Sequence, residues 1–146
     1  MHKDMLMIDG LQYVNWNRQL FEDAQQSGVH CIHVTIVYWE NIRETLENIG
    51  TWNRHFINHG DLIMPVRQAR DILEAKRLGK VGIVFGFQNC SPIEDDIGLV
   101  EKVYNLGCRF MQLTYNNQSL LATGCYETID SGVTNFGRQV IREMNR

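Results

Sequence analysis

The stretch that decides the fold is residues 81–87, VGIVFGF, seven apolar or small residues between a helical pattern and a polar turn. Its length and its apolar, partly β-branched composition predict a buried strand. Residues 29–37, VHCIHVTIV, have the same character. Shorter extended runs are predicted over residues 5–9, 62–66 and 109–114. The chain therefore contains several strands, of which the two longest are expected to be buried.

Helical patterns separate these strands, and glycines follow most of them as stop signals. The predicted helices cover residues 18–27, 40–59, 67–78, 91–106 and 134–146, with a potential interruption at Gly50. The helix over 91–106 has strong start signals, since Ser91 can cap it, Pro92 fits its first turn and acidic residues follow. Alternating strands and helices indicate βα units and a parallel sheet.

The predicted fold class is α/β, a partial (β/α)8 TIM-type barrel of about four βα units with a parallel sheet. We treat residues 1–146 as a single domain, the N-terminal half of a metal-dependent-hydrolase-like barrel. A complete barrel needs eight units and about 250 residues. Because half a barrel leaves two unpaired strand edges, the chain is a fragment, closes by association with another chain, or rearranges into an open sheet.

Composition narrows the class of protein. The 146 residues are 44% hydrophobic and 21% charged, with a net charge of −3 and no basic stripe, so nucleic-acid binding is not expected. No apolar run approaches the roughly 20 residues of a membrane-spanning helix. The short apolar stretch after residues 1–4 lacks the features of a signal peptide, so a cytoplasmic location is expected. The four scattered cysteines are interpreted as small buried hydrophobes.

Polar residues follow three of the predicted strands, at residues 9–13, 88–90 and 114–117. In parallel α/β folds, ligands bind outside the carboxyl ends of the strands. These positions therefore predict a polar pocket, while ordinary loop hydrogen bonding remains the alternative. The candidate pocket residues are Asp9, Gln12, Gln88, Tyr115 and Asn116.

Four histidines suggest metal sites only superficially. His55 and His59 lie four residues apart on a predicted helix, but without an accompanying acid a solvated helix face is the expected role. His30 and His33 lie on one predicted strand and point to opposite sides, so they cannot share a metal. Cys90 is a poor candidate nucleophile, since no histidine lies close to it in the sequence.

Aromatic residues recur along residues 16–56. They either line a binding wall or, as we expect, pack between helices and sheet. The residues concerned are Trp16, Tyr38, Trp39, Trp52 and Phe56.

Three stretches together resemble the membrane dipeptidase (renal dipeptidase) family: 86–92 (GFQNCSP), 106–117 (LGCRFMQLTYNN) and 133–146 (VTNFGRQVIREMNR). The ending FGRQVIREMN is the most specific part. Asp9 and Gly10 stand where the family carries its first metal motif, and Asn116 also matches. The resemblance implies the first half of a (β/α)8 hydrolase with two zinc ions that cleaves dipeptides.

The residues that the resemblance aligns with the metal site are substituted. The family follows Asp-Gly with His-x-Asp, and Leu11 and Tyr13 stand at those two ligand positions. Gln88 stands where the family has its metal-bridging Glu, and Tyr115 where it has a substrate-contacting His. Aliphatic, phenolic and amide side chains are poor or impossible zinc ligands. No metal site and no catalytic residue is therefore expected in this chain alone, and zinc is expected only in a full-length form.

Three hypotheses follow. The first is a hydrolase of dipeptides or small amides, of which this chain is an inactive or incomplete half. The second is a non-catalytic descendant that binds a small molecule through the same strand ends. The third is a truncated fragment without independent function. Exposed sheet edges also predict self-association.

Overall fold

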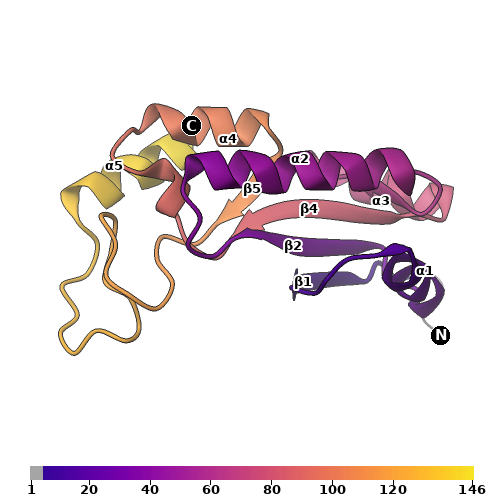
Figure 1. The fold of residues 1–146 in the computed structure, drawn as a ribbon, viewed down its shortest axis with the longest axis horizontal. Coiled ribbons are helices and arrows are strands. Elements are labelled where there is room, and N and C mark those ends of the chain that lie inside the picture. The colour runs from indigo at the N-terminus through magenta and orange to yellow at the C-terminus, as the bar shows by residue number, and fades with distance from the viewer. Residues whose placement is uncertain (1–4) are drawn as a thin grey trace. The chain divides into compact units, whose positions relative to one another are not determined.

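A computed structural model describes residues 5–146. Residues 1–4, part of the segment in which no signal peptide is expected, lie outside the described residues. Helices and strands alternate along most of the chain (Figure 1). The strands are β1 (Ile8–Gln12), β2 (Cys31–Val37), β3 (Ile63–Pro65), β4 (Val81–Phe87) and β5 (Cys108–Met111). The helices are α1 (Arg18–Ser27), α2 (Ile42–Asn58), α3 (Ala69–Leu78), α4 (Gly98–Asn105), α5 (Asn135–Met144) and the 3-10 helix η1 (Ser91–Ile93).

The five strands form a parallel sheet in the order β1-β2-β4-β3, and β5 also pairs with β4. The register of β3 sets Ile63 beside Val81, and that of β1 sets Ile8 beside Cys31. This confirms the predicted α/β class and the partial barrel of βα units. None of the helices in residues 5–146 combines the length and the hydropathy that crossing a bilayer requires.

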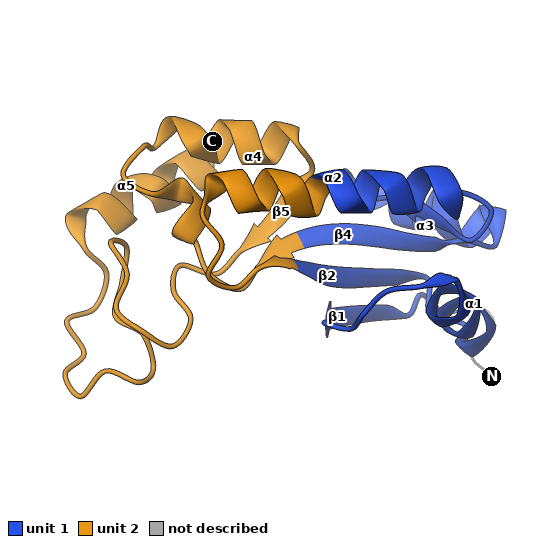
Figure 2. Cartoon of the chain, viewed as in Figure 1, with its two compact units in different colours: residues 1–35, 50–85 blue, residues 36–49, 86–146 orange. Residues whose placement is uncertain are grey.

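The chain divides into two compact units, residues 1–35 with 50–85 and residues 36–49 with 86–146 (Figure 2). Unit 1 holds an aromatic core around Phe21 of α1, which is fully buried. The Phe21 ring stacks on Trp16 with centroids 5.4 Å apart and lies 6.2 Å from Trp52. Phe56 and Phe85 extend the cluster at 5.9 Å. Trp16, Trp52 and Phe56 therefore have the packing role expected from the sequence.

Unit 2 contains the carboxyl ends of β2 and β4 together with β5, α4 and α5. The backbone N–H of Gln88 donates to the carbonyl of Val37, and that of Gln112 donates to Phe87, each at 2.9 Å. Thr134 caps α5 by accepting the N–H of Gly137 at 2.9 Å. The first two of these hydrogen bonds place Gln88 beside the end of β2 and Gln112 beside the end of β4.

The structure differs from the prediction in the helix over residues 91–106 and in the end of the first strand. The helix expected over residues 91–106 is broken into η1 and α4, because Glu94 adopts φ +50° and interrupts the helical backbone. The first strand was expected to end at Asp9, but β1 runs from Ile8 to Gln12. Asp9 and Gln12 therefore lie within the strand rather than after it. Gly50 does not interrupt α2.

Candidate functional site

The one carboxylate of β1 in unit 1, that of Asp9, is already hydrogen-bonded to residues of the same strand. Asp9 Oδ2 accepts from the side-chain amide of Gln12 at 2.6 Å, and Oδ1 accepts the backbone N–H of Leu11 at 3.1 Å. The His33 ring nitrogen Nδ1 contacts the carbonyl of Gly10 at 2.6 Å. The structure thus brings together two predicted pocket residues, Asp9 and Gln12, as partners of each other.

The two neighbouring positions carry side chains that open to solvent. Leu11 is 46% exposed and Tyr13 is 66% exposed. An aliphatic side chain has no lone pair to donate, and a phenol is protonated at neutral pH. This strand end therefore offers one carboxylate, already accepting two hydrogen bonds, and one amide.

In unit 2 the residues that follow β2 and β5 form an aromatic cluster, which we define as Tyr38, Trp39 and Tyr115. The Tyr115 ring lies 5.9 Å from Tyr38 and 5.5 Å from Trp39, with interplanar angles of 49° and 52°. The expectation that Tyr38 and Trp39 pack in a helix–sheet core is wrong for Trp39, which is 52% exposed. Tyr115, predicted as a pocket residue, is thus part of a partly open aromatic surface.

The loop that carries Tyr38 and Trp39 is held by the next residue. Glu40 Oε2 accepts the backbone N–H groups of both aromatic residues, at 2.6 and 2.9 Å. Ser91 Oγ donates to the Glu40 carbonyl at 2.8 Å. Because three hydrogen bonds fix this short turn, the aromatic cluster is preorganised and has a carboxylate beside it.

Gln88 and Asn116 occupy strand-end positions of the same unit. Asn116 Oδ1 accepts the thiol of Cys125 at 3.4 Å, and the Asn116 carbonyl accepts the N–H of Tyr126 at 2.8 Å. Asn116 therefore organises the loop after β5. Gln88, whose backbone bonds to Val37, is half-buried.

The candidate pocket residues omitted Asn89, which directly follows Gln88 within the predicted strand end 88–90. Asn89 is 6% exposed, and its buried Oδ1 has no hydrogen-bond donor within residues 5–146. A buried amide oxygen without a donor is costly, by about 1–3 kcal/mol. Its place at the end of β4 is the signal that could have identified it, since polar residues at strand ends were already singled out.

His55 lies in the last turn of α2, and His59 directly follows the helix. The expected solvated role of His55 and His59 is wrong, because their rings stack at 5.8 Å and each packs on Phe21, at 5.6 and 5.4 Å. Burial lowers the pKa of His55, and His59 and Arg54 lower it further.

Three of the four cysteines are buried, as expected. Burial raises the pKa of Cys31 to about 11 and those of Cys90 and Cys108 to about 12. A thiol with so high a pKa is a poor nucleophile, which argues against a catalytic Cys90. The expectation of burial is wrong for Cys125, which is exposed.

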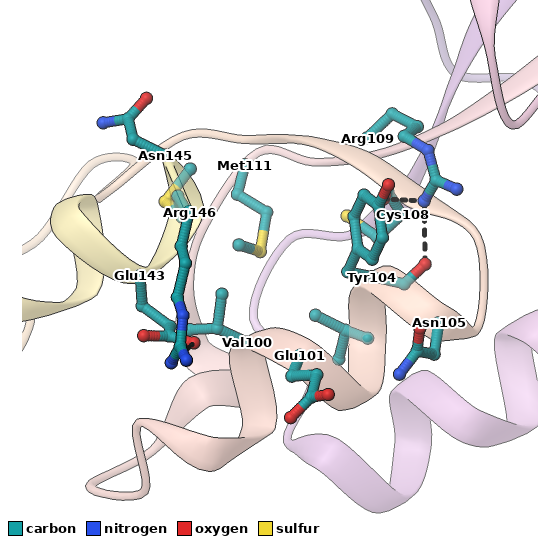
Figure 3. Close-up of a pocket in the computed structure, with 12 residues that line it drawn as sticks. Val100, Glu101, Tyr104, Asn105, Cys108, Arg109, Met111, Glu143, Asn145 and Arg146 are labelled. Carbon is teal, nitrogen blue, oxygen red and sulfur yellow. Dashed lines mark hydrogen bonds and ion pairs between the residues drawn. The ribbon is translucent and has the colours of Figure 1, made fainter.

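A cavity of about 760 Å³ lies elsewhere in unit 2, among α4, β5 and the end of α5 (Figure 3). None of the predicted pocket residues lines it. Three of its charged side chains have local partners: the Arg109 guanidinium lies 4.0 Å from the Tyr104 ring centroid, and Arg146 contacts Glu143 at 3.7 Å. Val103 and Cys108 give it a buried apolar floor. It has the character of a packing surface rather than a reaction site.

The sequence matches the family model of membrane dipeptidases, peptidase family M19, over residues 7–146. The chain belongs to the membrane dipeptidase family. Two dipeptidase relatives are dipeptidase verJ of Clonostachys rogersoniana and the uncharacterized dipeptidase C965.12 of Schizosaccharomyces pombe. They are 24% and 29% identical over 110 residues, which is 74% and 72% of this chain.

Solved structures of longer proteins superpose on almost all of the chain. An amidohydrolase from Pseudomonas aeruginosa is 45% identical with a TM-score of 0.97, and covers 99% of this chain. The probable dipeptidase PvdM from the same organism is 15% identical with a TM-score of 0.84, again over 99% of this chain. The chain spans 44% and 45% of those two structures, and the matched segments span 28% and 26% of the two dipeptidases.

The two-zinc centre that the membrane dipeptidase family implies does not fit the donors present here. No group of three or more His, Cys, Asp or Glu side chains in residues 5–146 is arranged to hold a metal ion. The carboxylate of Asp9 bonds to Gln12 instead, and an amide stands at position 88. Two close dications need several anionic or imidazole ligands, and among the candidate strand-end residues only Asp9 is one.

Proposed function

We propose that this chain forms the N-terminal half of a dipeptidase-like hydrolase of dipeptides or small amides. In this proposal its strand ends contact substrate and do not ligate metal. The observation that carries the proposal is the neutral character of the strand ends of unit 2, where Gln88 and Tyr115 offer an amide and a phenol. Membership of the membrane dipeptidase family supports the substrate class.

The residues proposed to contact substrate suit a peptide or amide group. An amide such as Gln88 both donates and accepts, so it can pair with the N–H and the C=O of a peptide bond. Asn89 Oδ1, which receives no hydrogen bond within residues 5–146, adds an acceptor at the same strand end. In this proposal, a catalytic metal would take its ligands from the part of the barrel outside residues 5–146.

The second candidate is a non-catalytic small-molecule-binding protein. The same neutral strand ends favour it, because binding by hydrogen bonds and ring contacts needs no metal. The two candidates make the same prediction for binding and differ only in turnover by the longer protein. Self-association of this chain is a separate proposal, supported by exposed apolar side chains on β1 (Ile8 at 53% and Leu11 at 46%), and size-exclusion chromatography tests it.

The test measures binding and hydrolysis of L-Ala-L-Ala by the purified 146-residue chain, with and without EDTA. We expect binding that EDTA does not change and no turnover. A matched pair of variants locates the site: Gln88→Leu is expected to weaken binding, whereas Tyr126→Leu, at a 73% exposed loop position, is expected to leave it unchanged. Turnover that EDTA abolishes would contradict the proposal, as would the absence of binding.

A further inference from the structure

We propose that the aromatic cluster of Tyr38, Trp39 and Tyr115 binds an ammonium group, the free amino end of a dipeptide or amino-acid amide. This inference rests on the proposed function, because it assigns one end of that substrate to one surface of unit 2. It also identifies Trp39 as a specificity-determining residue.

The ring geometry suits a small cation. The face of an aromatic ring attracts a cation that lies within about 6 Å of its centroid. The Trp39 and Tyr115 centroids are only 5.5 Å apart, so one ammonium group can lie within that range of both rings. Trp39, the strongest cation-binding ring type, is also the most accessible member, at 52% exposure.

The fixed charge beside the cluster has the sign that favours a cation. The Glu40 carboxylate accepts hydrogen bonds from the backbones of Tyr38 and Trp39 and is thereby held next to both residues. Its other oxygen, Oε1, accepts from the side-chain amide of Asn48 at 3.4 Å. A carboxylate held beside the cluster attracts an ammonium group and repels the carboxylate of a peptide. The surface therefore discriminates between the two ends of a dipeptide, and the amino end is favoured.

The position of the cluster agrees with this assignment. Val37 precedes Tyr38, and its carbonyl bonds to the N–H of Gln88 at 2.9 Å. Adjacent strands lie about 4.8 Å apart, so the aromatic cluster begins beside the residue proposed to pair with the substrate amide. An α-amino group is separated from its own amide by a single carbon atom, which matches a site where the two recognising groups are neighbours.

The experiment compares two ligands that differ in charge at one atom. L-alaninamide carries an ammonium group at pH 7, and N-acetyl-L-alaninamide is neutral there. Affinities for the 146-residue chain come from NMR titrations of the 15N-labelled protein. We expect L-alaninamide to bind roughly two- to fivefold more tightly, the range of a cation–π contact at an exposed site.

The variants locate the preference. Trp39→Leu and Tyr115→Leu are expected to abolish the advantage of L-alaninamide, while Trp39→Phe, which retains a ring, keeps part of it. Tyr126→Leu is the control, because that exposed tyrosine lies outside the cluster. The two-dimensional NMR spectrum of each variant shows whether the variant folds. If a leucine variant does not fold, Trp39→Phe still tests the proposal.

Equal affinity for the two ligands overturns the ammonium assignment and leaves the proposed binding of small amides intact. A preference that survives Trp39→Leu in a folded variant also overturns it, since the cation would then bind elsewhere. If neither ligand binds while L-Ala-L-Ala does, the assignment fails alone. If none of the three binds, the proposed function fails with it.

Discussion

Replacing Phe21 by alanine is expected to remove most of the stability of unit 1. The side chain is 0% exposed, and its ring has Trp16, Trp52, His55 and His59 within 5.4–6.2 Å. A buried aromatic side chain removes about 150–250 Å² from water, which at ~25 cal/mol per Å² corresponds to roughly 4–6 kcal/mol. Alanine retains a small part of this, so we expect a loss of about 4 kcal/mol.

The assay is urea denaturation of the 146-residue chain, followed by tryptophan fluorescence and by far-ultraviolet circular dichroism. Ile57→Ala is the matched control, because Ile57 lies on α2 in the same unit and is 81% exposed. Its free energy of unfolding is expected to change by less than about 0.5 kcal/mol. A loss below about 1 kcal/mol for Phe21→Ala, similar to that of the control, would refute the argument that this ring organises the core.

Three further predictions concern other parts of the chain. Gly137→Ala is expected to destabilise the chain by about 2 kcal/mol or more, measured by the same denaturation, because a Cβ atom there would overlap the backbone carbonyl of Leu121; unchanged stability would mean that α5 shifts freely. The lowered pKa of His55 means that the unfolded chain binds a proton more readily, so the unfolding free energy is largest above pH 6.5 and falls as the pH drops from 6.5 towards that lowered pKa. A denaturation series from pH 8 to pH 5 checks this, and a slope that His55→Gln leaves unchanged would refute it. Iodoacetamide is expected to label Cys125 alone in the folded chain and all four cysteines in urea, since the other three are buried; mass spectrometry counts the labels, and rapid labelling of a second cysteine in the folded chain would be inconsistent with it.

The parts of the fold that the sequence predicted well are those decided by local composition. The bounds of β4 and α1 agree with the prediction, because an unbroken apolar run and a helix followed by Gly28 leave little alternative. The helix over 91–106 was predicted from good start signals, yet Glu94 takes a left-handed φ of +50°. That backbone conformation depends on tertiary packing, which the helical start signals do not encode.

The candidate site at the strand ends stays a prediction, and the contacts of its residues could be predicted only in part. Asp9 and Gln12 were predicted as pocket residues after a strand that ends at Asp9, and their mutual hydrogen bond depends on the extension of β1 to Gln12. Trp39 was expected in a helix–sheet core, since such packing is more common than an aromatic binding wall. Its contact with Tyr115 joins residues 76 positions apart, and no periodicity in the sequence signals such a pairing.

The central claim is that the strand ends of this chain do not form the two-metal centre of the membrane dipeptidase family. Zinc titration of the metal-free chain in a calorimeter, with the bound metal counted by elemental analysis after dialysis, tests it most directly. We predict no stoichiometric zinc after dialysis. Two zinc ions per chain, bound at submicromolar concentration and retained on dialysis, would contradict the claim.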